Sequence, residues 1–412
     1  MARDKAVLGW VLYDFANVIF ALGVVALHLP LWIVDEQGGR DRHVAIVASL
    51  SMLVVMLLSP RLGRRVDRTG KRVAPLAIST VICVVLTTMI GTGGLVQSMV
   101  IFGLANVAFG CGLVFYDALL PVVSTAENRG QISGRGMAAG FGGALIAVVT
   151  GIVILAISPA AKPLVFVALA GLFLLGSIPC FLWVKDPPCA AIAHPDGAGL
   201  RASIGRCREV PGMSRFLIGR VLYTDAANTL FAFMSIYAVK EMGFSDLQTQ
   251  MVLLFGILTG PIGALGAGRM SDRIGPKRTL DRILVLWMAI LAACALIPML
   301  GLPRNLFWLV APLGGLAFGS TSTVDRALLI ELSPANETGT FFGLFAMVGR
   351  FSSLIGPIMW AVVADWLGQG RPTAVAALLL LTATAYWLFR DLPDWLSVPR
   401  QESMELAEAT AG

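Results

Sequence analysis

Residues 108–134, "AFGCGLVFYDALLPVVSTAENRGQISG", return in altered form as residues 317–343, "AFGSTSTVDRALLIELSPANETGTFFG". The two stretches align without a gap at a shift of 209 residues. A long internal match of this kind indicates that the chain consists of two related halves. Each copy also carries charge inside an apolar run, Asp117 in the first and Asp325 with Arg326 in the second.

Two further pairs of stretches extend the repeat over most of the chain. "DFANVIFA" from Asp14 matches "DAANTLFA" from Asp225, and "GRRVDRTGKR" from Gly63 matches "GRMSDRIGPKR" from Gly268. We therefore expect two halves with a connecting segment and a tail. Their predicted bounds are 1–184, 185–212 for the linker, 213–390, and 391–412 for the tail.

The composition indicates that both halves lie in a membrane. The chain of 412 residues is 57% hydrophobic and only 14% charged, whereas soluble domains carry about 25% charged residues. Apolar runs of about 20 residues recur, and each is long enough to cross a hydrocarbon core of about 30 Å. Twelve spans are predicted, near 7–33, 43–60, 74–95, 97–121, 136–157, 163–184, 213–239, 247–267, 280–301, 305–330, 340–363 and 372–389. The long, uninterrupted first span argues against a cleaved signal peptide.

Lysine and arginine predict the orientation. With the N-terminus inside, the internal loops collect clusters such as 61–72, 201–215 and 269–282, while the external loops hold only scattered basic residues. Both termini are then cytoplasmic, in the inner membrane of a cell. This bias accounts for the net charge of +6, so we infer no nucleic-acid partner from it.

Six spans in each half, with a G-x-x-x-D-R-x-G loop after the second span of each, resemble the major facilitator superfamily. Within it, "GWVLYDFANVIFALGVVALHLPLWI" from Gly9 resembles the start of the vacuole-effluxer family, which includes fungal vacuolar amino-acid exporters and bacterial relatives. "VFYDALLPVV", "SGRGMAAGFGG" and "GRFSSLIGPIMW" resemble its fourth, fifth and eleventh spans. The resemblance covers the whole chain. It implies an all-α membrane protein of twelve transmembrane helices in two pseudo-symmetric six-helix halves.

Ionisable residues at membrane depth are expensive and commonly functional. Here they fall in spans 1, 4, 7, 10 and 11, and the resemblance implies that spans 1, 4, 7 and 10 line a central cavity. The candidate substrate or coupling residues are Asp14, Asn17, Tyr116, Asp117, Asp225, Asn228, Asp325, Arg326 and Arg350. Arg220 lies closer to the cytoplasmic end of span 7. The alternative for any one aspartate is a structural bond between helices.

The alternatives differ among these residues. Arg350 either neutralises Asp325 or Asp117, or binds an anionic group such as a carboxylate. Tyr116 either shapes a pocket or packs. A neighbouring cation would hold Asp325 ionised, which suits a structural pair. Asp14 is therefore our first candidate for a proton carrier, Asp225 the second and Asp117 the third.

The repeated loops form a second candidate region. By resemblance they act as gates on the cytoplasmic side rather than as substrate ligands, with an aspartate that can cap a helix and glycines that allow a tight bend. The gating residues are Gly63, Asp67, Arg68, Gly70, Gly268, Asp272, Arg273 and Gly275. In contrast, "GMAAGFGGALIA" from Gly136 and "GILTGPIGALGAG" from Gly256 have the small-residue spacing of close helix crossings.

The sequence contains no Walker loop, no H-E-x-x-H motif and no soluble catalytic domain, so an enzyme, a cofactor and a resident metal are not expected. We predict a monomeric secondary transporter that exports a small polar solute such as an amino acid, coupled to protons or sodium. One alternative is an exporter of a metal or organic cation. An alternative of another class is a non-transporting receptor or scaffold, which would have no use for two gating loops.

Overall fold

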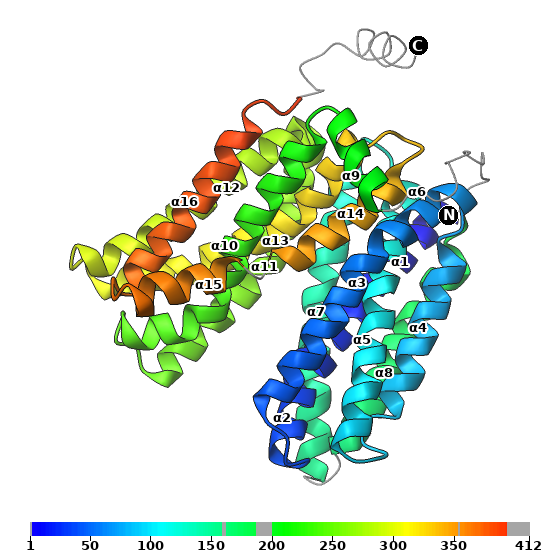
Figure 1. The fold of residues 1–412 in the computed structure, drawn as a ribbon, viewed down its shortest axis with the longest axis horizontal. Helices are drawn as coiled ribbons and strands as arrows, with labels where there is room; N and C mark the ends of the chain where they lie inside the picture. Colours follow the sequence, from blue (N-terminus) through cyan, green and yellow to red (C-terminus); the bar gives the residue numbers. More distant parts are fainter. Residues whose placement is uncertain (1, 159–161, 187–199, 353–354, 394–412) are drawn as a thin grey trace. The chain divides into compact units, whose positions relative to one another are not determined.

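A computed structural model describes residues 2–158, 162–186, 200–352 and 355–393, and in these ranges the regular structure is entirely helical (Figure 1). Most of the predicted linker and tail lie outside the described residues. Contact clustering divides the chain into two units. Unit 1 comprises Met1–Arg206 with Ser333–Arg350, and unit 2 comprises Cys207–Leu332 with Phe351–Gly412. The predicted bounds at residues 184 and 213 stay a prediction, because Ser333–Arg350 is grouped with unit 1.

Unit 1 contains the helices of the first six predicted spans. The first span is made of three consecutive elements, α1 (Ala2–Val18), the π-helix η1 (Ile19–His28) and α2 (Leu29–Asp35). The other helices are α3 (Asp41–Thr69), α4 (Val73–Thr88), α5 (Leu95–Asp117), α6 (Leu120–Val123), α7 (Arg129–Ile157) and α8 (Lys162–Trp183), followed by α9 (Leu200–Glu209) in the linker.

Unit 2 contains the helices of the second half, except for part of one. They are α10 (Met213–Lys240), α11 (Asp246–Ile274), α12 (Pro276–Met299), η2 (Arg304–Leu306), α13 (Phe307–Leu332) and α16 (Arg371–Phe389). The eleventh span is built from α14 (Thr338–Phe351), α15 (Ile355–Ala361) and the π-helix η3 (Val362–Trp366). Most of α14 belongs to unit 1, while α15 belongs to unit 2.

Length and composition agree with a membrane protein. Among the described residues, ten helical segments are long and apolar enough to span a bilayer, and α4 is a shorter apolar helix. The helix α10 is long, but its centre carries Arg220 and Asp225. Together these account for the twelve predicted spans. Many large apolar side chains are exposed, including Leu104, Leu145 and Leu254, as expected for helices that face lipid.

Glycines set the close helix crossings, as the small-residue spacing predicts. A Cβ added to Gly263 of α11 would lie 2.0 Å from the carbonyl oxygen of Leu316 in α13. In unit 1 another close crossing is between α7 and α1, where a Cβ on Gly143 would lie 2.0 Å from the carbonyl oxygen of Phe15. Neither position has room for a side chain, so these glycines allow backbones to approach.

Candidate substrate and coupling site

The Asp14–Asn17 pair lies on α1, where residues three apart share a face. Asn17 donates from Nδ2 to Oδ1 of Asp14 over 3.0 Å. Asp14 is only 3% exposed, and a Cβ added to Gly136 of α7 would lie 2.7 Å from its Oδ2 atom. The first predicted coupling carboxylate is therefore hydrogen-bonded within its own helix and packed against α7.

Tyr116 ties α5 to α1 beside this pair. Its ring stacks on Trp10 and on Tyr13, with ring centroids 4.8 Å apart in both cases. Its hydroxyl donates to the carbonyl oxygen of Trp10 over 3.2 Å, while the indole of Trp10 donates to the carbonyl oxygen of Tyr116 over 3.3 Å. The side chain is fully buried in unit 1, and whether Tyr116 shapes a pocket or only packs stays a prediction.

Asp117 and Arg350 come together in unit 1. Arg350, near the end of α14, acts electrostatically on Asp117 and Cys111 of α5. A Cβ added to Gly110 would lie 3.2 Å from Nη2 of Arg350. Its predicted roles, as a partner of Asp117 or Asp325 or as a ligand for an anionic group, stay predictions.

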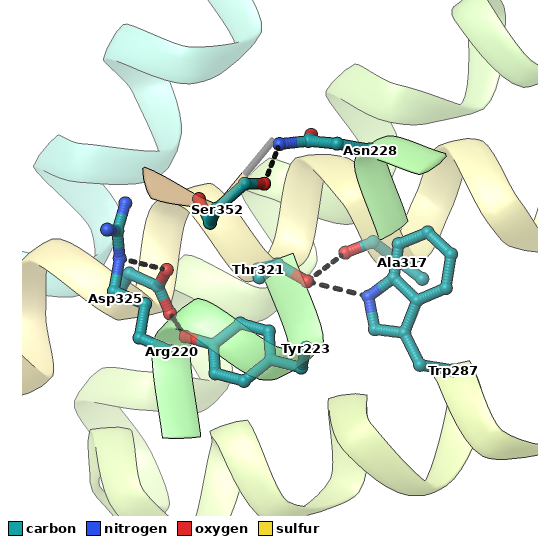
Figure 2. A network of polar contacts seen from close by, with 8 residues as sticks. All are labelled: Arg220, Tyr223, Asn228, Trp287, Ala317, Thr321, Asp325 and Ser352. Atoms are coloured by element: carbon teal, nitrogen blue, oxygen red, sulfur yellow. Dashed lines mark hydrogen bonds and ion pairs between the residues drawn. The ribbon is translucent and has the colours of Figure 1, made fainter. Parts of the chain in front are cut away.

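The second D-x-x-N pair lies on α10 in unit 2, and its bonding differs from that of the first. Asn228 donates from Nδ2 to the carbonyl oxygen of Ser352, the turn residue after α14, over 3.2 Å (Figure 2). Asp225 is 0% exposed, and within the described residues neither of its carboxylate oxygens has a hydrogen-bond partner. The sequence repeat therefore predicts the position of this pair but not its bonds.

Asp325 on α13 lies near two cations, Arg220 of α10 and its neighbour Arg326. Arg220 donates from Nε to Oδ2 of Asp325 over 3.1 Å, and Tyr223 donates its hydroxyl to Oδ1 (Figure 2). The sequence shows only the adjacent Arg326, while the ion pair itself comes from another helix. Arg326 is half-buried on α13.

Arg220 and Tyr223 are residues that the sequence pattern leaves without a role. Their i, i+3 spacing in the sequence could have indicated a shared role, because it puts both side chains on one face of α10. Next to this group, Trp287 of α12 donates to the hydroxyl of Thr321 over 2.9 Å, and that hydroxyl donates to the carbonyl oxygen of Ala317 (Figure 2).

The first gating loop joins α3 to α14 within unit 1. The carboxylate of Asp67 accepts hydrogen bonds from the backbone N–H groups of Gly339 and Thr340, over 2.7 and 2.6 Å. These N–H groups belong to the first turn of α14, which has no partners for them inside the helix. Asp67 is thus a helix cap in trans, and its charge complements the positive end of the helix dipole.

Glycines and an ion pair complete this capped end. A Cβ added to Gly63 would lie 2.1 Å from the carbonyl oxygen of Gly339, so only glycine permits this approach of α3 to α14. Gly70 ends α3 with φ +67°. From the linker helix α9, Arg206 donates to both oxygens of Glu337, with Nη2–Oε1 at 2.8 Å.

The second gating loop, like the first, ends its helix at a glycine with positive φ, but with a different ψ, 151° at Gly275 against −8° at Gly70. Gly268 is buried in α11, and Gly275, between α11 and α12, has φ +88°. Asp272 is half-buried, and both Arg68 of the first loop and Arg273 of the second are exposed.

Comparison with known proteins identifies the family. The model for "Vacuole effluxer Atg22 like" matches residues 43–392. The MFS-type transporter YxiO of Bacillus subtilis (strain 168) is 23% identical, and the match covers 93% of this chain and 94% of YxiO. Autophagy-related protein 22-1 of Aspergillus fumigatus is 25% identical over 61% of this chain and 46% of its own length.

Solved structures support the fold. The E. coli fucose:proton symporter FucP superposes with a TM-score of 0.75 at 15% identity, over 94% of this chain and 97% of FucP. A bacterial homologue of the iron transporter ferroportin, in an outward-facing state, gives 0.75 at 16% identity, over 94% of this chain and 98% of that chain. With twelve membrane helices in two repeated halves, this chain is a multi-pass integral membrane protein and belongs to the Atg22-like vacuole-effluxer family of major facilitator superfamily transporters.

Proposed function

We propose that this protein is a secondary active transporter that works by alternating access and exports a small polar solute, such as an amino acid, from the cytoplasm. The observation that carries the proposal is the buried carboxylate of Asp225, which has no hydrogen-bond partner in the described part of the chain. A buried charge without a partner is costly, so a structural role gives no reason to keep it. The effluxer description of the family supports movement of a solute across a membrane, and the outward direction is part of the proposal.

The proposed topology places both termini in the cytoplasm, in the inner membrane of a cell, with the protein acting as a monomer. The concentration of Lys and Arg in alternate loops supports this orientation. Asp67 and Arg206 would then act on the cytoplasmic side, where capping of α14 stabilises one state of the transport cycle.

The test is transport by the purified chain in proteoliposomes, with a panel of labelled amino acids, other zwitterions and divalent cations. We expect at least one amino acid to be taken up when a proton or sodium gradient is imposed, and uptake to stop when an ionophore removes the gradient. Liposomes without protein give the background. The matched control is Asp365→Asn, because Asp365 is exposed in η3.

Other outcomes decide among the alternatives. Uptake of a divalent or organic cation alone would replace the amino acid by a cation as the substrate, a reading that buried oxygen ligands such as Asp225 favour. Failure of every solute to cross faster than in empty liposomes, with the protein folded and correctly inserted, would contradict transport and leave a receptor or scaffold.

A further inference from the structure

The buried carboxylate of Asp225 lies where α10 meets α15. A Cβ added to Gly356, the second residue of α15, would lie 2.9 Å from Oδ2 of Asp225 and 2.0 Å from Oγ1 of Thr229. Both oxygens therefore flank the backbone of Gly356. Asp225 and Thr229 are one helical turn apart on α10, so their side chains share a face.

Both side chains have unused hydrogen-bonding capacity. Thr229 is 1% exposed, and its hydroxyl, like the carboxylate of Asp225, has no partner in the described part of the chain. The backbone N–H groups of Gly356 and Ile355, at the start of α15, interact favourably with the carboxylate, but neither makes a hydrogen bond to it by distance and angle. A hydroxyl, a carboxylate and a closely packed glycine together form a small buried polar site.

The charged groups around this site are already satisfied by one another. On α10 and α13, Arg220 and Tyr223 bind Asp325. The helix α15 carries no ionisable residue, and at the outer end of α16 Arg371 binds Glu241. The described groups that act on Asp225 include none of these. They also do not include Tyr386 of α16 or the charged residues near the ends of α11. No described cation is therefore placed to neutralise the carboxylate.

We propose that Asp225 binds the coupling proton, and that the protonated carboxyl donates a hydrogen bond to the hydroxyl oxygen of Thr229. Proton binding converts the carboxylate to a neutral acid, which removes the buried charge and uses the free acceptor. On the Gly356 side, even a methyl carbon would clash with Thr229, so the packing suits a proton better than a hydrated or coordinated metal cation. The inference deepens the proposed function and rests on it.

The unequal bonding of the two repeats supports Asp225 over Asp14 for this role. Asn17 donates to Asp14, so that carboxylate has a hydrogen-bond partner, while Asn228 donates to the carbonyl oxygen of Ser352. Ser352 and Gly356 lie on either side of the start of α15, and the two units divide just before, between Arg350 and Phe351. A proton at Asp225 therefore acts beside the start of α15, within the eleventh span.

A direct test measures protonation without any transported solute. Infrared difference spectra of the reconstituted protein are recorded between acidic and alkaline buffers. We expect the C=O band of a buried protonated carboxyl in the wild type, its loss in Asp225→Asn, and its retention in Asp365→Asn.

If Asp225→Asn does not fold, Thr229→Val replaces it as the test variant. Loss of one hydrogen bond should weaken proton binding about tenfold, while Thr382→Val, at a buried threonine bonded within α16, leaves it unchanged.

Transport then separates the two proposals. With a solute found in the panel, Asp225→Asn should exchange it at the wild-type rate but no longer accumulate it against a gradient, and the exposed control Asp365→Asn should still accumulate it. A carboxyl band that persists in Asp225→Asn, or accumulation lost in Asp14→Asn but kept in Asp225→Asn, would overturn the assignment and leave transport intact. Sodium-dependent thermal stabilisation that Asp225→Asn abolishes, without a carboxyl band, would replace the proton by sodium. Absence of any transport, with the band present, would contradict only the proposed function.

Discussion

The two copies of the D-x-x-N pair make different bonds. In unit 1, Asn17 binds Asp14 on the same helix. In unit 2, Asn228 binds the carbonyl oxygen of Ser352 instead, and the carboxylate of Asp225 is buried without a hydrogen bond in the described chain. The same four-residue pattern thus gives a satisfied pair in one unit and an unsatisfied carboxylate in the other.

The difference comes from the helix that each pair meets. Asp14 lies against α7, a helix that continues without interruption past Gly136. Asp225 lies against the start of α15, and the turn residue Ser352 after α14 offers a carbonyl oxygen that competes for the amide of Asn228. Duplication preserves residues, but partner helices decide which hydrogen bonds they make.

The largest expected effect on stability comes from leaving the carboxylate of Asp325 without its cation, as that of Asp225 is. Arg220→Met removes the cation from Asp325 and leaves a buried charge, so we expect the free energy of unfolding to fall by about 3–5 kcal/mol. Titration of the micellar protein with SDS measures it. Arg215→Met is the control, because its ion pair with Asp391 is exposed on both sides and is expected to contribute at most about 1 kcal/mol. Unchanged stability in Arg220→Met would mean that unit 2 tolerates an unpaired buried carboxylate, and the state of Asp225 would carry no functional meaning.

The repeated loops extend the comparison to gating. Asp67→Asn keeps a carbonyl oxygen for one N–H group of α14 but loses the charge, and hydrogen bonds to a charged group are worth about 1.5–3 kcal/mol each. We expect turnover to fall about tenfold or more with little change in substrate affinity, and a smaller loss of the same kind in Asp272→Asn. Turnover and affinity are measured in the proteoliposome assay, with the exposed Arg65→Gln as control. Wild-type turnover in both aspartate variants, with normal folding, would remove the gating role.

A third test compares the two aspartates directly. Asp14→Asn removes a charged acceptor from Asn17, so we expect a loss of about 1–3 kcal/mol in the free energy of unfolding. Asp225→Asn breaks no hydrogen bond of the described structure and removes a buried charge, so its stability should equal or exceed that of the wild type. The SDS titration decides. Equal destabilisation by the two variants would show that Asp225 has a structural partner.

The smallest effect distinguishes the two asparagines. Asn17→Ala removes a bond to a charged group, expected to contribute about 1.5–3 kcal/mol, whereas Asn228→Ala removes a bond to a neutral carbonyl, expected to contribute about 0.5–1.5 kcal/mol. The same titration should therefore rank Asn17→Ala as the more destabilising change. The reverse order would mean that the contact of Asn228 with Ser352 holds the eleventh span more firmly than a single neutral bond can.

The sequence predicts the fold well, because span length, basic loops and a gapless repeat are all local or pattern properties. It also predicts which carboxylates are buried, since apolar neighbours along one helix reveal that. Partners are harder to predict, because they depend on how helices are rotated and on which elements meet. Sequence adjacency places Arg326 beside Asp325, but the ion pair with Arg220, on another helix, is visible only in the structure. The cap that Asp67 provides for α14 joins residues more than half the chain apart.

The grouping of Ser333–Arg350 with unit 1 has a consequence for biosynthesis. A nascent chain that has passed Arg206 still lacks α14. This is the helix against which Gly63 packs, and its backbone N–H groups donate to the carboxylate of Asp67. These contacts can form only after the ribosome has made most of the second half, including α10 to α13. A fragment that ends in the linker would lack the helix that Asp67 caps.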